Sequence, residues 1–190
     1  FLLLAVGVNV RGRNRLPRRG PALIVANHNS HLDALVLVAM LPLRLLFHTR
    51  PAASAEYFLR GRWRAWFATE VIGIIPVETG GGRPHAEVLG KVRDALAAGN
   101  LVIFFPEGTR GEPECLGKLK TGIVWLAQQL PDVPICPVRL CGLGRVLPKG
   151  DWLPVPFFCD AWVGEPLHWE GDRQRLMTAL VANLGGSLVT

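Results

Sequence analysis

Short apolar segments alternate with amphipathic segments along most of this chain, and this alternation constrains the fold more than any other feature. Continuous apolar runs favour buried strands, whereas apolar residues spaced three and four positions apart favour helices. Strands that alternate with helices are typical of an α/β sheet with helices on its faces. The expected strands are 22–26, 43–47, 71–77, 101–105, 135–140 and 158–163, and the expected helices are 31–40, 54–69, 84–98, 118–130 and 172–184.

The composition favours a folded domain with a substantial core. Of the 190 residues, 49% are hydrophobic and only 19% are charged, which excludes intrinsic disorder. No apolar run reaches the roughly 18 residues needed to cross a bilayer. We divide the chain into a basic and apolar membrane-proximal segment, residues 1–20, and a globular domain, residues 21–190.

Positive charge is concentrated in the first third of the chain. The net charge is +6, and residues 1–65 hold ten arginines against only Asp33 and Glu56. One cluster comprises Arg11, Arg13, Arg15, Arg18 and Arg19, and a second comprises Arg60, Arg62 and Arg64 beside Trp63, Trp66 and Phe67. Such clusters suit anionic lipid headgroups, nucleic acid, or simply a solvated surface. The apolar composition favours the lipid surface.

The cysteines and histidines do not form a metal-binding pattern. Cys115, Cys136, Cys141 and Cys159 show no paired spacing, and the five histidines do not flank them at zinc-finger distances. We therefore expect free, mostly buried thiols in a reducing compartment, and no metal site.

A polar loop follows the first expected strand and contains a candidate general base. On a continuous helix His28 and Asp33 would lie about 140° apart, but His28 on a loop before the helix brings the two together. A carboxylate that accepts a hydrogen bond from one imidazole nitrogen fixes the tautomer, and the other nitrogen can then take a hydroxyl proton. Two alternatives stay open: Ser30 and Asp33 fit a capping box, and His31 is a second candidate base.

A second polar loop, residues 105–111, follows the strand at 101–105 and favours anion binding. Gly108 permits close backbone approach, Thr109 offers a hydroxyl, and Arg110 offers a planar fork that matches phosphate oxygens. Lys118 and Lys120 follow shortly after. An ordinary tight turn with solvated charges is the alternative.

Taken together, in this order, the two loops resemble the signature motifs of the glycerolipid acyltransferase family, whose members acylate lysophosphatidic acid or related lysolipids. The matching positions are Asn27, His28, Ser30 and Asp33 of the His-x4-Asp motif, residues 105–110, and, more weakly, residues 133–138 and 164–167. The family's second motif departs from its pattern here. An arginine usually follows it, but Glu78 is followed by Thr79, and Arg83 is the candidate replacement.

The resemblance implies a fold and a reaction. The fold is a single domain like that of glycerol-3-phosphate acyltransferase, with a mixed, mostly parallel sheet flanked by helices. The reaction moves a fatty acyl group from acyl-CoA or acyl-carrier protein to the free hydroxyl of a lysophospholipid. With 1-acylglycerol-3-phosphate as acceptor, the product is phosphatidic acid, in phospholipid biosynthesis. No bound cofactor and no metal are expected, because a thioester is already activated.

The resemblance also implies roles for the residues of the motifs. His28 removes the acceptor's hydroxyl proton, Asp33 orients and stabilises His28, and amides near residues 27–30 are candidate oxyanion donors. Glu107 contacts acceptor hydroxyls or fixes Arg110. The substrate-binding candidates are Asn27, Ser30, Arg83, Glu107, Gly108, Thr109, Arg110 and Lys120.

The implied partners are the lipid bilayer, the lysophospholipid acceptor and, as an alternative donor, an acyl-carrier protein, with no nucleic acid. The implied location is the cytoplasmic face of the inner (plasma) membrane. Three other functions stay open: an acyltransferase for a lysolipid acceptor without phosphate, a non-catalytic basic membrane-binding module, and a Cys–His hydrolase that uses Cys115.

Overall fold

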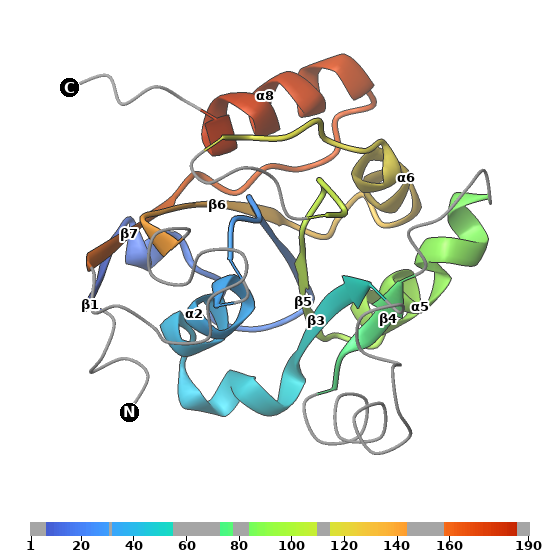
Figure 1. Ribbon diagram of the computed structural model, residues 1–190. Coiled ribbons are helices and arrows are strands. Elements are labelled where there is room, and N and C mark those ends of the chain that lie inside the picture. The colour runs from blue at the N-terminus through green and yellow to red at the C-terminus, as the bar shows by residue number, and fades with distance from the viewer. Residues whose placement is uncertain are drawn as a thin grey trace.

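The chain folds around one sheet, which is mixed and mostly parallel (Figure 1). The structure is a computed structural model that describes residues 7–30, 32–54, 73–77, 84–109, 115–143 and 158–185. Within these ranges seven strands form the sheet in the order β1-β7-β6-β2-β5-β3-β4. Their bounds are β1 Gly7–Arg11, β2 Ala22–Ala26, β3 Thr49–Ser54, β4 Ile75–Val77, β5 Leu101–Phe104, β6 Ile135–Cys141 and β7 Phe158–Val163.

Strand direction determines where the polar loops lie. β2 pairs in parallel with both β5 and β6, and β3 pairs in parallel with β5 and β4. The pair β6–β7 is antiparallel. The carboxyl ends of β2 and β5 therefore meet at one edge of the sheet, so that the loops after residues 26 and 104 are neighbours. Ligand sites in α/β sheets commonly lie at this edge.

Helices cover both faces of the sheet, as Figure 1 shows. Their bounds are α2 Asp33–Met40, α5 His85–Ala97, α6 Gly122–Gln129 and α8 Arg173–Gly185, and two short 3-10 helices are η1 Arg13–Arg15 and η2 Leu43–His48. The buried side chains of β2 divide between two apolar clusters. Ile24 belongs to the cluster that includes α2, whereas Leu23 and Val25 belong to the cluster that includes α5, α6 and α8. This alternation, typical of a central strand, fixes β2 between the two helical layers.

The predicted α/β class with a mostly parallel sheet is confirmed, and most predicted elements lie where expected. One predicted strand, 43–47, is wrong, because this segment forms η2. Leu43 and Phe47 are 80% and 84% exposed there, and Leu45 is buried. The helix predicted over 118–130 begins only at Gly122, since residues 115–120 have no regular secondary structure. Of the helix predicted over 54–69, residues 55–69 lie outside the described residues, and Ser54 ends β3.

The first arginine cluster lies at the amino edge of the parallel strands, opposite to the polar loops. Arg18 and Arg19 precede β2 directly, and Arg18 accepts a hydrogen bond through its carbonyl oxygen from Arg44 Nη2 at 3.4 Å. Arg15 forms an ion pair with Glu165 at 2.7 Å. β1, which the sequence assigned to the membrane-proximal segment, pairs with β7 in the sheet. The division of the chain at residue 20 stays a prediction.

Replacing two glycines of this fold with alanine should change its stability in opposite directions. A β-carbon on Gly20 would overlap the backbone carbonyl oxygen of Gly99, whereas one on Gly90, inside α5, would meet nothing within 4 Å. We expect Gly20→Ala to lower the free energy of unfolding by about 1–3 kcal/mol. Gly90→Ala should raise it by about 0.5–1 kcal/mol, because alanine is the better helix former. Chemical denaturation checks both, and a stabilised Gly20→Ala variant would contradict this packing.

Candidate active site

The first polar loop connects β2 to α2 and holds an imidazole and a carboxylate together. His28 Nδ1 lies 2.9 Å from Asp33 Oδ2. The same oxygen accepts hydrogen bonds from the amides of Asn29 at 2.6 Å and Ser30 at 2.8 Å. Since an ionised carboxylate only accepts, the hydrogen-bonding network places the imidazole proton on Nδ1. The predicted contact between His28 and Asp33 is therefore present.

Asp33 is fully buried, and its carboxylate holds the backbone of the loop as well as the imidazole. It is the first residue of α2, and the N-cap residue is Leu32, so Ser30 and Asp33 do not form the capping box that the sequence left open. The hydroxyl of Ser30 instead accepts from the Leu32 amide at 3.3 Å. Asp33 thus shapes the start of the helix and holds the imidazole at the same time.

Phe105, which follows β5, packs against the candidate base. Its ring stacks on that of His28 with the centroids 4.2 Å apart and an angle of 21° between the planes. The His28 side chain remains 22% exposed. Among the described residues no hydrogen bond engages Nε2. The arrangement therefore fixes one nitrogen and one face of the ring and leaves the other nitrogen without a hydrogen-bond partner among the described residues.

The amides of the first loop are already engaged. The N–H of His28 donates to Glu107 Oε1 at 2.8 Å, and those of Asn29 and Ser30 donate to Asp33. Asn27 is engaged as well: its Nδ2 donates to Leu140 O at 2.8 Å, and its Oδ1 accepts from Leu140 N at 2.7 Å. In this structure the amides of residues 28–30 are thus not free to receive an oxyanion. Asn27 ties the loop to β6.

Glu107 joins the first loop to the segment that follows the second one. Its side chain is 5% exposed. Oε1 accepts from the His28 amide, and Oε2 accepts from the Gly117 amide at 2.8 Å. A β-carbon on Gly117 would stand 2.6 Å from Oε2, so a larger residue there would displace the Glu107 carboxylate. The sequence assigned Glu107 to acceptor hydroxyls or to Arg110, but its carboxylate connects two backbone segments.

Replacing Glu107 with glutamine should therefore destabilise the protein. Glutamine offers one acceptor oxygen, and its NH2 group would face the second amide donor. We expect the free energy of unfolding to fall by about 1–3 kcal/mol. Glu165→Gln is the control, because that carboxylate is 72% exposed and should change stability by less than about 0.5 kcal/mol. Urea denaturation compares them, and equal effects would contradict the bridging role.

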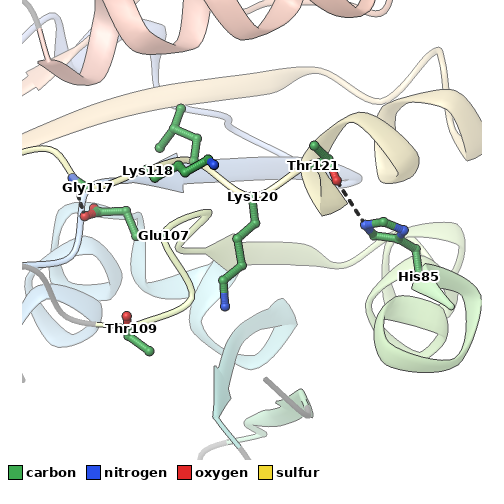
Figure 2. A pocket seen from close by; sticks show the side chains of 8 residues that line it. His85, Glu107, Thr109, Gly117, Lys118, Lys120 and Thr121 are labelled. Atoms are coloured by element: carbon green, nitrogen blue, oxygen red, sulfur yellow. Dashed lines mark hydrogen bonds between the residues drawn. The ribbon is translucent and has the colours of Figure 1, made fainter. Parts of the chain in front are cut away.

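A pocket of about 580 Å³ opens on the other side of Glu107. Its walls come from the second loop, the segment 115–120, and the starts of α5 and α6 (Figure 2). The lining residues are His85, Glu107, Thr109, Gly117, Lys118, Leu119, Lys120 and Thr121. Gly108, with φ +75°, carries the turn, and a β-carbon there would overlap Lys120 Nζ. The Lys120 side chain thus lies against the second loop at Gly108.

The structure brings together some of the predicted residues and adds others. Glu107, Thr109 and Lys120 share the pocket, and Glu107 links it to the loop of His28 and Asp33. The predicted candidates His31, Arg83 and Arg110 lie outside the described residues. Sequence reasoning missed His85, Gly117 and Thr121 as parts of the site, and it gave Phe105 no contact with His28. For Thr121, a hydroxyl residue before the helix at Gly122 was an available signal; His85 had none.

Two of the four cysteines, Cys136 and Cys159, are buried thiols. Burial raises the pKa of the Cys136 thiol to about 11. Burial, and to a lesser degree the charge of Asp160, raises the pKa of Cys159 to about 11. Both groups are therefore protonated thiols near neutral pH. Cys115 is exposed.

No cluster of three or more potential metal ligands occurs within the described ranges. None of the helices described there is both long and apolar enough to span a bilayer.

Comparison with known proteins identifies the family. The family model described as Acyltransferase matches residues 7–141, well over half of the chain. The chain belongs to this acyltransferase family. The resemblance seen in the His-x4-Asp loop and in residues 105–110 is thereby confirmed.

Individual relatives agree with this assignment. The chain is 31% identical over 189 residues to human 1-acyl-sn-glycerol-3-phosphate acyltransferase alpha. This match covers 99% of this chain and 64% of the human protein. It is 30% identical over 144 residues to a chloroplastic 1-acyl-sn-glycerol-3-phosphate acyltransferase of Arabidopsis thaliana. That match covers 75% of this chain and 38% of the plant protein. The chain thus spans less than two thirds of these relatives.

A solved structure confirms the fold. The 1-acyl-sn-glycerophosphate acyltransferase of Thermotoga maritima superimposes with a TM-score of 0.71 and 22% sequence identity. The match covers 91% of this chain and 67% of the other. The glycerol-3-phosphate acyltransferase-like architecture expected from the motifs is therefore correct.

Proposed function

We propose that this protein transfers a fatty acyl group from a thioester donor to the free hydroxyl of 1-acylglycerol-3-phosphate, giving phosphatidic acid. The observation that carries the proposal is the His28 imidazole, held at Nδ1 by buried Asp33, with no hydrogen-bond partner for Nε2 among the described residues. The human and Arabidopsis relatives, both named 1-acyl-sn-glycerol-3-phosphate acyltransferases, support the same reaction. The donor is acyl-CoA or an acyl-carrier protein.

The chemical step needs one base. Nε2 of His28 takes the proton of the acceptor hydroxyl while its oxygen attacks the thioester carbonyl carbon. Asp33 stabilises the imidazolium that forms. When the C–S bond breaks, the imidazolium returns the proton to the sulfur, so that a free thiol and an oxygen ester leave the site. Because the amides of residues 28–30 already donate to Glu107 and Asp33, other donors would have to stabilise the oxyanion.

The acceptor's phosphate has a candidate location in the pocket beside Glu107. Thr109 and Lys120 line it and offer a hydroxyl and an ammonium group. Arg83 and Arg110 stay candidates from the sequence. Asn27 and Ser30 would act by shaping the loop, since their side chains already bond to Leu140 and to the Leu32 amide. Glu107 would likewise position His28 through its backbone amide.

Action at a membrane surface, on its cytoplasmic face, is part of the proposal because the acceptor is a lipid. The first arginine cluster lies at the edge of the sheet opposite to His28, so it would not bring the site to the bilayer directly. The second cluster, around Trp63, lies outside the described residues. Flotation with anionic vesicles, comparing charge-reversal variants of each cluster, would assign the contact to one of them.

Free-thiol release from acyl-CoA, measured against a panel of acceptors, tests the proposed reaction. We expect release to depend on 1-acylglycerol-3-phosphate and to be weak with monoacylglycerol or an amino-acid-based lysolipid. Preference for an acceptor without phosphate would favour the alternative acceptor class. Thiol release without any acceptor, abolished by thiol alkylation, would point to a cysteine hydrolase. Vesicle binding with no release at all would leave a membrane-binding module.

A further inference from the structure

Large apolar side chains are exposed mainly on one short stretch of the chain. Among the described residues, four such side chains are exposed: Leu35, Leu43, Phe47 and Val181. The first three lie in α2 and η2, which only residues 41–42 separate. A single exposed apolar residue is ordinary on a protein surface, but several together mark a surface that contacts something else.

The backbone of η2 is held in a way that turns two of these side chains outward. Leu45 is buried in the apolar cluster that includes α2. Its amide donates to Pro42 O at 2.8 Å, and its carbonyl oxygen accepts from Oγ1 of buried Thr49 at 2.7 Å. With three residues per turn, Leu43 and Phe47 project about 120° to either side of Leu45. Their exposure therefore follows from how η2 is attached to the core.

The charges that accompany this apolar stretch are positive. Between buried Asp33 and Glu56 the sequence has no acidic residue. Exposed Arg44 lies in η2 and donates to the carbonyl oxygen of Arg18, so that Arg18 and Arg19, both exposed, lie close to η2. Apolar side chains beside arginines suit an anionic bilayer, in which the former enter the acyl boundary and the latter meet lipid phosphates. A second copy of the same surface would set arginines against arginines.

We propose that the α2–η2 face, formed by Leu35, Leu43, Arg44 and Phe47, is the surface by which this protein docks on an anionic lipid bilayer. α2 begins at Asp33, which holds the His28 imidazole, and its eight residues extend about 12 Å from that loop. A bilayer that lies along this face therefore reaches from η2 to the loop of the candidate base. The inference rests on the proposed action at a membrane surface and assigns to it an apolar contact outside both arginine clusters.

Flotation of the 190-residue chain with vesicles tests this surface. One set of vesicles contains phosphatidylcholine with phosphatidylglycerol, and the other contains phosphatidylcholine alone. The variants are Phe47→Ser, Leu35→Ser and Arg44→Gln. Val181→Ser is the matched control for Leu35→Ser, because the two side chains are 48% and 49% exposed but Val181 lies in α8, on the other side of the sheet from α2 (Figure 1). Since all four side chains are exposed, the melting temperatures should stay close to the parent's.

We expect Phe47→Ser to weaken binding to the anionic vesicles about tenfold, and Leu35→Ser to weaken it by a smaller factor. Arg44→Gln should weaken it about fivefold on anionic vesicles and leave binding to neutral vesicles unchanged. Val181→Ser should bind like the parent. Parent-like binding by both Phe47→Ser and Arg44→Gln would overturn the inference, as would an equal loss in Val181→Ser. A parent dimer that Phe47→Ser dissociates without loss of vesicle binding would also overturn it and assign the face to a second copy.

The binding readout separates this inference from the proposed reaction. If the parent protein transfers no acyl group but Phe47→Ser still loses vesicle binding, the docking surface stands and the reaction is wrong. If transfer depends on His28 but no variant of the α2–η2 face changes vesicle binding, the reaction stands and the docking surface is wrong.

Discussion

Replacing His28 with alanine should lower kcat for acyl transfer by about 10²–10⁴-fold, the usual contribution of a positioned general base. The substitution removes the only group in the described site whose free nitrogen is held ready to take a proton. The fold should persist, because the His28 side chain is 22% exposed and the bond from its backbone amide to Glu107 does not depend on the side chain.

The control for this variant is His48→Ala. His48 is also exposed, but it lies in η2, before β3 and therefore at the opposite edge of the sheet. Both variants are compared by thiol release and by thermal unfolding. A His28→Ala protein that keeps a tenth or more of the parent's kcat would remove this imidazole from the chemistry.

The second large effect is expected for Asp33→Asn, which should impair both catalysis and stability. Oδ2 of Asp33 accepts three hydrogen bonds, and Oδ1 is buried without a partner. An asparagine NH2 group would either face three donors or be buried with no acceptor. The negative charge opposite the imidazolium would be lost as well. We expect unfolding free energy to fall by about 1.5–3 kcal/mol and kcat to fall at least about 10²-fold.

Asp94→Asn is the matched control for the second variant. Asp94 also lies in a helix, but its side chain is 65% exposed and pairs only with neighbouring Arg93 among the described residues. Its substitution should leave kcat unchanged and shift stability by less than about 0.5 kcal/mol. If Asp33→Asn keeps the parent's kcat and only the stability falls, Asp33 only holds the loop before α2 in place.

Regular hydrophobic patterns made much of the fold predictable. β2 and β5 are continuous apolar runs that the centre of a parallel sheet requires, and α5 combines a helical spacing with a proline before it and Gly99 after it. The errors lie where local pattern and tertiary context disagree. Leu43 and Phe47 form an apolar segment that would suit a strand, yet both face solvent in η2.

Other elements carried too weak a signal for sequence analysis. β3 contains Pro51 and two alanines, and β1 lies in a segment whose arginines suggested a membrane-facing role. Both strands are defined by pairing with β5 and β7 rather than by their own residues. Whether such a segment forms a strand depends largely on the neighbouring strand with which it pairs, and a single sequence does not show that pairing.

In the candidate site, a contact between residues close in the chain was predictable, whereas contacts between distant residues were not. The contact between His28 and Asp33 is local, so the motif and the geometry of a loop before a helix were sufficient to predict it. The bridge from Glu107 to the His28 amide joins residues far apart in the chain, and the pairing of His85 with Thr121 requires two helix starts to converge. Contacts of this kind depend on the tertiary packing of the sheet and its helices.

The most direct measurement of the central claim follows thiol release and phosphatidic acid formation in one reaction with acyl-CoA and 1-acylglycerol-3-phosphate. A base that delivers the acceptor's oxygen to the thioester predicts one phosphatidic acid for each thiol released, and the loss of both products in His28→Ala. Thiol release without an equivalent of phosphatidic acid, or undiminished phosphatidic acid formation by His28→Ala, would contradict it.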